Sequence, residues 1–220
     1  MNGIKNCVAV DQRVGLRFTI NHHNIQELEN IFDFIEEENI NRVCFYHLVY
    51  SGRGNQMMDE DVTAEESRRA MDIIIRRTRD FEERGLKKEI LTVDNHCDGV
   101  YMYLKALQEG KDELAQQIKK YIAMNGGNRS GMAFAEVDPL GYVHPDQFTQ
   151  HHTFGNVRER KFGDIWQDTT NPIMAGLKDR KPLLKGRCSK CKFLDNCNGN
   201  FRTRAEARTG DFWESDPSCY

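Results

Sequence analysis

Four of the seven cysteines gather in the segment 188–220, at spacings that suit a metal centre. They are Cys188, Cys191, Cys197 and Cys219. A CxxC pair lets two thiolates reach one centre across a tight turn, while the third and fourth cysteines complete the coordination from the rest of the tail. Four thiolates without a neighbouring histidine suit Zn²⁺ or an iron–sulfur cluster, and the spacing alone leaves both open.

Composition narrows the class of protein. An odd cysteine count argues against a pure disulfide framework and favours a reducing compartment, so we expect a cytoplasmic protein. The net charge of −3 with no basic stripe makes nucleic acid an improbable partner. No apolar run approaches the roughly 20 residues that span a bilayer, so we expect no membrane association.

The first half of the chain alternates strand and helix patterns. The strands are predicted at 14–20, 42–50 and 89–94, and each is followed by an apolar repeat of helical period. Asn24 with Glu27, and Thr63 with Glu66, have the spacing of helix-capping boxes. This alternation predicts an α/β fold with a parallel sheet and right-handed crossovers.

Polar residues follow each predicted strand. The first strand leads into Asn21, the second into Ser51 and Arg53, and the third into Asn95 and His96. Because the carboxyl ends of parallel strands share one edge of the sheet, we expect these side chains to border a binding site. The alternatives are a helix cap for Asn95 and a solvated turn for Arg53.

The pattern changes at Asn125-Gly126-Gly127-Asn128, a glycine-rich junction. A hairpin is predicted over 132–144, then short helices near 161–167 and 172–180, then a cysteine-rich tail with little periodicity. We therefore predict two domains, 1–124 and 125–220, the second organised by its metal centre.

The tail Cys188–Tyr220 resembles the C-terminal auxiliary-cluster domain (SPASM/Twitch) of radical S-adenosylmethionine (SAM) enzymes. Other stretches resemble the radical SAM family of haem d1 biosynthesis, the NirJ family; they are Val14–Thr19, His47–Asp61, Ser67–Asp72, Leu91–Gly99 and Asn125–Gly131. The resemblance implies the C-terminal half of a partial (βα)6 barrel, followed by a small α+β iron–sulfur domain. It also implies an auxiliary [4Fe–4S] cluster on the four tail cysteines.

A SPASM domain with two clusters has further cysteines. In this chain three of those positions fall on Ser130, Asp146 and Phe201, and all three belong to the first auxiliary cluster. Since every ligand position of the second cluster is kept, the resemblance implies a one-cluster variant.

The resemblance implies that SAM contacts come from Arg17, Thr19 and Asn21, with further SAM or substrate contacts from Ser51, Arg53, Asn95 and His96. SAM and a second [4Fe–4S] cluster belong to the complete enzyme, whose CxxxCxxC motif does not occur in this sequence. We therefore expect a fragment that is inactive alone, with the missing N-terminal half and an electron donor as partners. Catalytic residues are not assigned.

The implied substrate is a tetrapyrrole, 12,18-didecarboxysirohaem, which loses propionate groups. The alternatives are the related enzyme of the alternative haem pathway, which removes acetate groups, a peptide-maturing radical SAM enzyme, and a non-catalytic four-cysteine zinc module. Cys44, within an apolar strand, is expected to be a buried core thiol. Arg202 and Arg204 are expected to offset the charge of the cluster, to hold propionates, or to lie on a solvated face.

Overall fold

The computed structural model describes residues 2–220 and has a parallel sheet at its centre. Its strands are β1 (Gly15–Thr19), β2 (Arg42–Tyr46) and β3 (Glu89–Val93), in the spatial order β1-β2-β3. Both strand pairs are parallel and in register, so Arg17 lies beside Cys44 and Cys44 beside Leu91. The predicted α/β fold with a parallel sheet is confirmed.

Two helices cover one face of this sheet, α2 (Leu28–Glu37) and α3 (Ala64–Glu83). Alternate strand residues such as Val43 and Phe45 point into this layer, and neither is exposed. The Phe32 ring stacks on Phe45 at 5.1 Å between centroids and meets Phe81 at 5.9 Å. Burial of these rings holds the helices against the sheet.

The other face of the sheet has no helix over it in the part of the chain described. Arg17 and Thr19 are exposed there, and Cys44 and Tyr46 are half-buried. Cys44 is therefore not the core thiol predicted from its apolar strand, because its position alternates with the buried Val43 and Phe45. Parallel sheets normally bury both faces, so this face is the one that an additional layer would cover.

The two predicted capping boxes have different outcomes. Thr63 accepts from the Glu66 backbone, and the Glu66 carboxylate accepts from the Thr63 backbone, so that box is present at the start of α3. Asn24 caps nothing with its side chain; its Oδ1 accepts from Asn21 N at 2.9 Å instead. The chain enters α2 through a short 3₁₀ turn, η1 (Ile25–Glu27).

Four further elements complete the first half of the chain. Helix α1 (Asn2–Ala9) precedes β1, and a 3₁₀ segment, η2 (Gly52–Glu60), follows β2. After β3 come α4 (Cys97–Gln108) and α5 (Asp112–Asn125), which pack as a helical hairpin. The strand predicted to reach Tyr50 ends at Tyr46, because the chain turns away from the sheet there.

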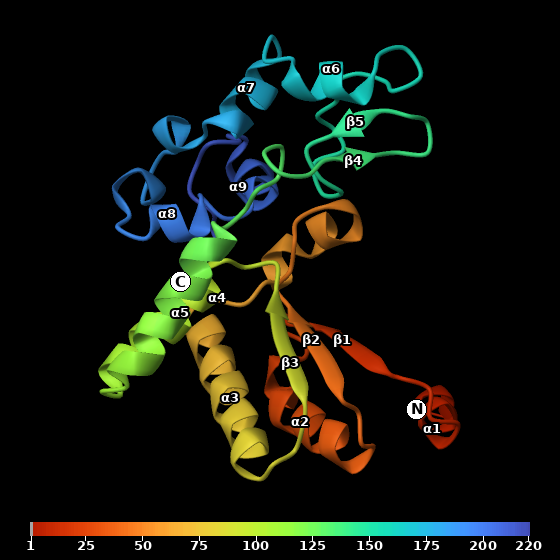
Figure 1. The fold of residues 1–220 in the computed structure, drawn as a ribbon, viewed down its shortest axis with the longest axis vertical. Helices are drawn as coiled ribbons and strands as arrows, with labels where there is room; N and C mark the ends of the chain where they lie inside the picture. Colours follow the sequence, from red (N-terminus) through yellow and green to blue (C-terminus); the bar gives the residue numbers. More distant parts are fainter. Residues whose placement is uncertain (1) are drawn as a thin grey trace.

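The second half of the chain lies across the carboxyl ends of the strands (Figure 1). Its hairpin is short, with β4 (Glu136–Val137) antiparallel to β5 (Val143–His144). Short helices follow; they are α6 (Phe162–Gln167), α7 (Pro172–Lys178), η3 (Lys181–Leu183), η4 (Cys188–Lys190), α8 (Leu194–Cys197) and α9 (Arg202–Thr209). Helix α9 was not predicted, because charged residues dominate its sequence and even its buried residues include Arg202 and Arg204. Within residues 2–220, no helix has the length and apolar character needed to cross a bilayer.

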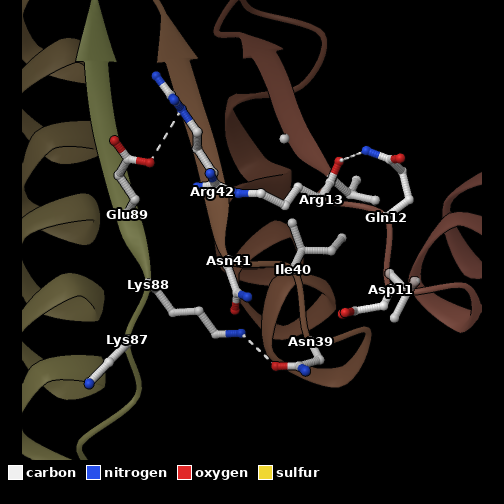
Figure 2. A pocket seen from close by; sticks show the side chains of 13 residues that line it. Asp11, Gln12, Arg13, Asn39, Ile40, Asn41, Arg42, Lys87, Lys88 and Glu89 are labelled. Carbon is white, nitrogen blue, oxygen red and sulfur yellow. Dashed lines mark hydrogen bonds and ion pairs between the residues drawn. The ribbon is translucent and has the colours of Figure 1, made fainter.

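A cavity of about 790 Å³ lies at the opposite edge of the sheet, where the strands begin (Figure 2). Its wall is made of turn residues and charged side chains. They include the ion pair of Arg42 with Glu89, at 3.4 Å, and the contact of Lys88 Nζ with Asn39 Oδ1, also at 3.4 Å. No cysteine or histidine lines it. In parallel α/β folds the chemistry lies at the carboxyl ends, so the site is sought there.

Candidate functional site

The carboxyl edge of the sheet is joined to the cysteine-rich region by polar contacts. Ser51 Oγ donates to the Phe148 carbonyl at 2.9 Å. Asn95 Oδ1 accepts from Asn200 Nδ2 at 2.6 Å, and Asn95 Nδ2 donates to the Ser218 carbonyl at 2.9 Å. The polar groups of Ser51 and Asn95 are thus engaged within the fold, where they fix one half of the chain against the other.

Asn21 serves a local turn. It is buried, and its side chain donates to the Thr19 carbonyl at 3.3 Å and accepts from the His23 backbone at 2.9 Å. It therefore shapes the exit from β1.

Three of the predicted residues face solvent. Arg17 places its guanidinium 4.5 Å from the Tyr46 ring centroid on the uncovered face of the sheet, where Thr19 is also exposed. Arg53 is exposed within η2 and has no hydrogen-bonding partner among residues 2–220. Their polar groups are available to a ligand.

His96 differs from its neighbours because its ring is free. Its backbone N donates to Asn200 Oδ1 at 2.9 Å, but neither ring nitrogen has a partner among the described residues. The ring lies nearly parallel to Phe201, with centroids 5.9 Å apart. Burial, with the nearby positive charge of Arg204, lowers the pKa of His96 to about 4, so the imidazole is neutral near pH 7.

His96 lines a cavity of about 570 Å³ between the sheet edge and the cysteine-rich region. Phe134, Phe148 and Phe201 give the cavity an aromatic wall, and Arg129 adds a positive charge. This volume lies within the range of small-molecule and cofactor sites. We call it the edge cavity.

The residues at the absent cysteine positions meet beside the edge cavity. Ser130 Oγ donates to Asp146 Oδ2, and Asp146 Oδ1 accepts from Thr149 Oγ1 at 2.9 Å. Asp146 and Phe201 both line the cavity. Ser130, Asp146 and Phe201, the three positions that the resemblance assigned to the first auxiliary cluster, are therefore neighbours in space. They carry a hydrogen-bonded pair and an aromatic ring in place of thiols.

The four tail cysteines come from turns that the chain folds around one point. Cys188 opens η4, Cys197 closes α8, and the Cys191 sulfur accepts from the Phe193 backbone N at 3.4 Å. Burial, and then the charges of the other three thiols, raises the pKa of Cys197 to about 12. Such mutual repulsion means that four thiolates require a cationic centre among them.

The sulfur positions bear on which centre fits. No three of these sulfur atoms lie within 4.8 Å of one another in the part of the chain described. Zinc–sulfur bonds of about 2.3 Å in a tetrahedron would hold the sulfurs about 3.8 Å apart. A [4Fe–4S] cluster spaces its thiolates more widely, because each binds a different iron. Four thiolates from separate turns are a donor set that suits a [4Fe–4S] cluster.

Arg202 adds a second observation at the cysteine site. It is buried, and its guanidinium donates to the carbonyls of Gly199, Phe212 and Glu214. Its Nε is buried with no partner among the described residues. Burial lowers the pKa of Arg202, and the charges of Cys188 and Cys197 raise it. The unpaired Nε–H therefore lies near these cysteines. Cluster sulfur is an acceptor of the kind that would satisfy it.

Cys97 lies against the last cysteine ligand position. A hydrogen bond from the Cys97 thiol lowers the pKa of Cys219 below its usual range, while burial raises that of Cys97. Cys97 also bonds to Asn95 Oδ1 at 3.0 Å. The sequence placed Cys97 in a segment with possible substrate or SAM contacts, and its position next to Cys219 arises from the packing of α4 beneath the tail.

The expectation that Arg202 and Arg204 could lie on a solvated face is wrong for both. Neither side chain reaches solvent to any extent, and Arg204 is fully buried against Asp216. In the sequence, the Arg204–Asp216 ion pair is indicated by Asp216, an acidic residue three positions before the final cysteine.

A buried cluster of His47, Asp98 and Tyr220 was also missed. His47 Nε2 lies 3.1 Å from an Asp98 oxygen, and Tyr220 Oη donates to the other. Burial alone would raise the pKa of Asp98, but the charge and hydrogen bond of His47 and the bonds from Tyr220 and Thr92 lower it overall. His47 and Asp98 both lie in stretches that carried the family resemblance.

Comparisons with known proteins agree with this geometry. Residues 130–192 match the family model of SPASM, an iron–sulfur cluster-binding domain. The chain is 53% identical over its whole length to Fe-coproporphyrin III synthase of Methanosarcina barkeri and 37% identical over 99% of its length to pre-haem d1 synthase of Dinoroseobacter shibae. It spans about half the length of these relatives, 56% and 54%.

Solved structures show the same fold. SuiB of Streptococcus suis, bound to S-adenosylmethionine, superposes with a TM-score of 0.65 at 17% identity. That comparison covers 99% of this chain and 47% of SuiB. The anSMEcpe structure with bound AdoMet gives a TM-score of 0.62 at 13% identity, over 99% of this chain and 55% of that one. The chain therefore carries a segment that matches the SPASM iron–sulfur domain, is similar along its whole length to two synthases named for haem-type products, and shares the fold of two AdoMet-bound structures.

Proposed function

We propose that this chain forms part of a radical SAM enzyme that modifies carboxylate-bearing side chains of an iron tetrapyrrole. The haem-pathway names of its relatives support the substrate class. The chain is 53% identical to Fe-coproporphyrin III synthase and 37% identical to pre-haem d1 synthase. The higher identity favours formation of Fe-coproporphyrin III over the haem d1 reaction that the sequence resemblance implied. In the favoured reaction the tetrapyrrole would lose acetate groups, whereas in the haem d1 reaction it would lose propionate groups.

The edge cavity is the observation that carries the substrate assignment. A tetrapyrrole is flat, aromatic and ringed with carboxylates, and this cavity offers aromatic walls and the guanidinium of Arg129. His96 presents a neutral, unpaired imidazole, which is a good ligand for iron at the centre of the macrocycle. We therefore assign His96 to the substrate iron and Arg129 to a substrate carboxylate.

The four tail cysteines are proposed to hold one auxiliary [4Fe–4S] cluster, within a domain spanning 125–220 that follows a half-barrel spanning 1–124. The match of residues 130–192 to an iron–sulfur cluster-binding domain, and the Nε of Arg202 that has no partner among residues 2–220, support this assignment. In this proposal SAM and its own cluster, held by the first half of the enzyme, supply the radical chemistry, and an external electron donor reduces the clusters.

The remaining residues divide between ligand contact and positioning. We assign Arg17, Thr19 and Arg53 to SAM contact, because they are exposed and their polar groups are available. Asn21, Ser51 and Asn95 are positioning residues, because their side chains already bond within the fold. The uncovered face of the sheet would receive the first half of the barrel.

The cluster is tested by anaerobic reconstitution of the chain with iron and sulfide. We expect about four iron and four sulfide per chain, reduced sharply by Cys191→Ala but not by Cys44→Ala. One tightly held zinc and no retained iron would overturn the cluster and favour the structural zinc module.

The substrate assignment is tested separately by titrating the chain with iron coproporphyrin III and following its Soret band. We expect a saturable shift typical of nitrogen ligation, which His96→Ala removes while weakening Kd by about tenfold or more. The matched control, His23→Ala, removes an exposed histidine and should leave both unchanged. An unaltered band and affinity in His96→Ala would refute the assignment.

A further inference from the structure

Two adjacent histidines and one glutamate form a cluster apart from the cysteines and the edge cavity. The donor atoms of His151, His152 and Glu206 all lie within 4.8 Å of one another. His151 Nε2 is 2.7 Å from Glu206 Oε2, and His152 Nε2 is 3.0 Å from Glu206 Oε1. Both imidazoles therefore point at one carboxylate.

The fold holds this arrangement from two sides. Glu206 lies on α9, the helix whose residue Arg204 is fixed by Asp216. The histidines lie in the turn after β5, with ring centroids 4.3 Å apart. His152 packs its ring edge-on against Phe212 at 5.1 Å, and its carbonyl lies 3.0 Å from His144 Nδ1. His152 is thus fixed in place, while His151 is the exposed member.

A second cavity, of about 300 Å³, opens beside the cluster. His151 and Glu206 line it together with Ser51 and Thr203. Thr203 is only 4% exposed, and its Oγ1 is buried with no hydrogen-bonding partner among the described residues. A buried hydroxyl without a hydrogen-bonding partner is unfavourable, so this wall of the cavity holds an unsatisfied polar group.

We propose that His151, His152 and Glu206 bind one divalent transition-metal ion of the zinc type, with a water molecule as the remaining ligand. Two imidazole nitrogens and one carboxylate oxygen are the protein ligand set of open, four-coordinate zinc sites. The cavity of about 300 Å³ that His151 and Glu206 line leaves room for the water in the fourth position. The site is separate in ligands and in position from the four cysteines.

The competing explanation is that the histidines only donate hydrogen bonds to Glu206. His23 and Glu60 provide the matched case, since their ion pair has a similar distance, 2.8 Å, but a single histidine. That pair should bind no metal tightly, because a tight site requires three convergent donors. It therefore serves as the internal control.

The test uses the full chain with its cluster reconstituted anaerobically, so that the cysteines are occupied. Isothermal titration with Zn²⁺ should show one further equivalent per chain. Glu206→Gln and His151→Ala should each weaken its Kd by about tenfold or more, with His23→Ala unchanged. His151 is exposed, so its loss should not affect folding, which iron content and circular dichroism verify.

Co²⁺ then identifies the ligands. Bound to the two histidines and the carboxylate, it should show weak visible bands without the intense thiolate-to-cobalt absorption of a cysteine site. The proposal is overturned by the absence of a saturable equivalent, by thiolate absorption on that equivalent, or by unchanged affinity in both Glu206→Gln and His151→Ala.

Discussion

Arg204 and Asp216 form an ion pair, 2.8 Å from Nη2 to Oδ2, in which neither side chain reaches solvent. Arg204 Nη1 also donates to the carbonyls of Leu48 at 3.2 Å and Asp94 at 2.8 Å, which lie just beyond β2 and β3. One guanidinium therefore ties the helix next to the cysteines to the carboxyl edge of the sheet.

Replacing Arg204 should destabilise the whole chain. In Arg204→Met the Asp216 carboxylate stays buried without its partner, so we expect a loss of about 3–5 kcal/mol in the free energy of unfolding. Urea denaturation followed by circular dichroism measures this. Arg208→Ala breaks an exposed pair with Asp59 and should cost at most about 1 kcal/mol. Equal, small effects of the two substitutions would contradict the structural role.

Gly127 is packed against the third cysteine ligand position. Its φ is +69°, and a Cβ there would lie 2.2 Å from the Cys197 carbonyl carbon. Gly126 has the same φ of +69°, but its Cβ would meet only Arg129, at 4.0 Å. Gly126→Ala should therefore cost only backbone strain, about 1–2 kcal/mol. Gly127→Ala should cost more and also displace Cys197, which lowers the iron retained after reconstitution.

Iron per chain and the thermal midpoint of the two alanine variants distinguish these effects. Equal iron content in both variants would show that the contact of Gly127 with Cys197 does not matter for the cluster.

Asp98 should make stability dependent on acid pH. Its folded-state pKa is depressed, so its ionised form stabilises the fold above the ordinary aspartate pKa of about 3.9. That stabilisation should disappear as pH falls through the lower, folded value. Asp98→Asn should cost about 1–3 kcal/mol at pH 7, because His47 and Tyr220 lose a charged partner.

Urea unfolding of the wild type and Asp98→Asn across pH 7 to 3 checks the sign. The difference in unfolding free energy between the wild type and Asp98→Asn should become smaller below about pH 4. Asp33→Asn, at an exposed position, is the control. A difference that widens in acid would contradict the assignment.

The outer strands of the sheet should promote self-association. Strands β1 and β3 each have one side without a neighbouring strand, and the Arg17 face of the sheet is uncovered. We expect concentration-dependent association of the isolated chain in sedimentation velocity. Thr19→Lys, which adds a charge to the exposed strand β1, should reduce it, whereas Gln12→Lys outside the strand should not. A monodisperse monomer at all concentrations would contradict this expectation.

The sequence by itself determined the elements and the ligand types. Periods of two and of 3.6 residues located the three strands and their helices, since burial on one face imposes those periods. Thr63 with Glu66 marked a helix start, because a capping box is a local interaction. The CxxC spacing predicted a metal centre for the same reason, and the polar residues at the strand ends followed from parallel topology.

Only the tertiary structure decided which polar groups are free. Asn95 and His96 are neighbours in sequence, yet Asn95 is bonded to Asn200 and Ser218 while the His96 ring has no partner among residues 2–220. Arg204 and Glu206 likewise share one short helix, but one is buried and the other meets two histidines. Apart from the Arg204–Asp216 pair, these outcomes depend on contacts between residues more than 50 positions apart, which no local pattern records.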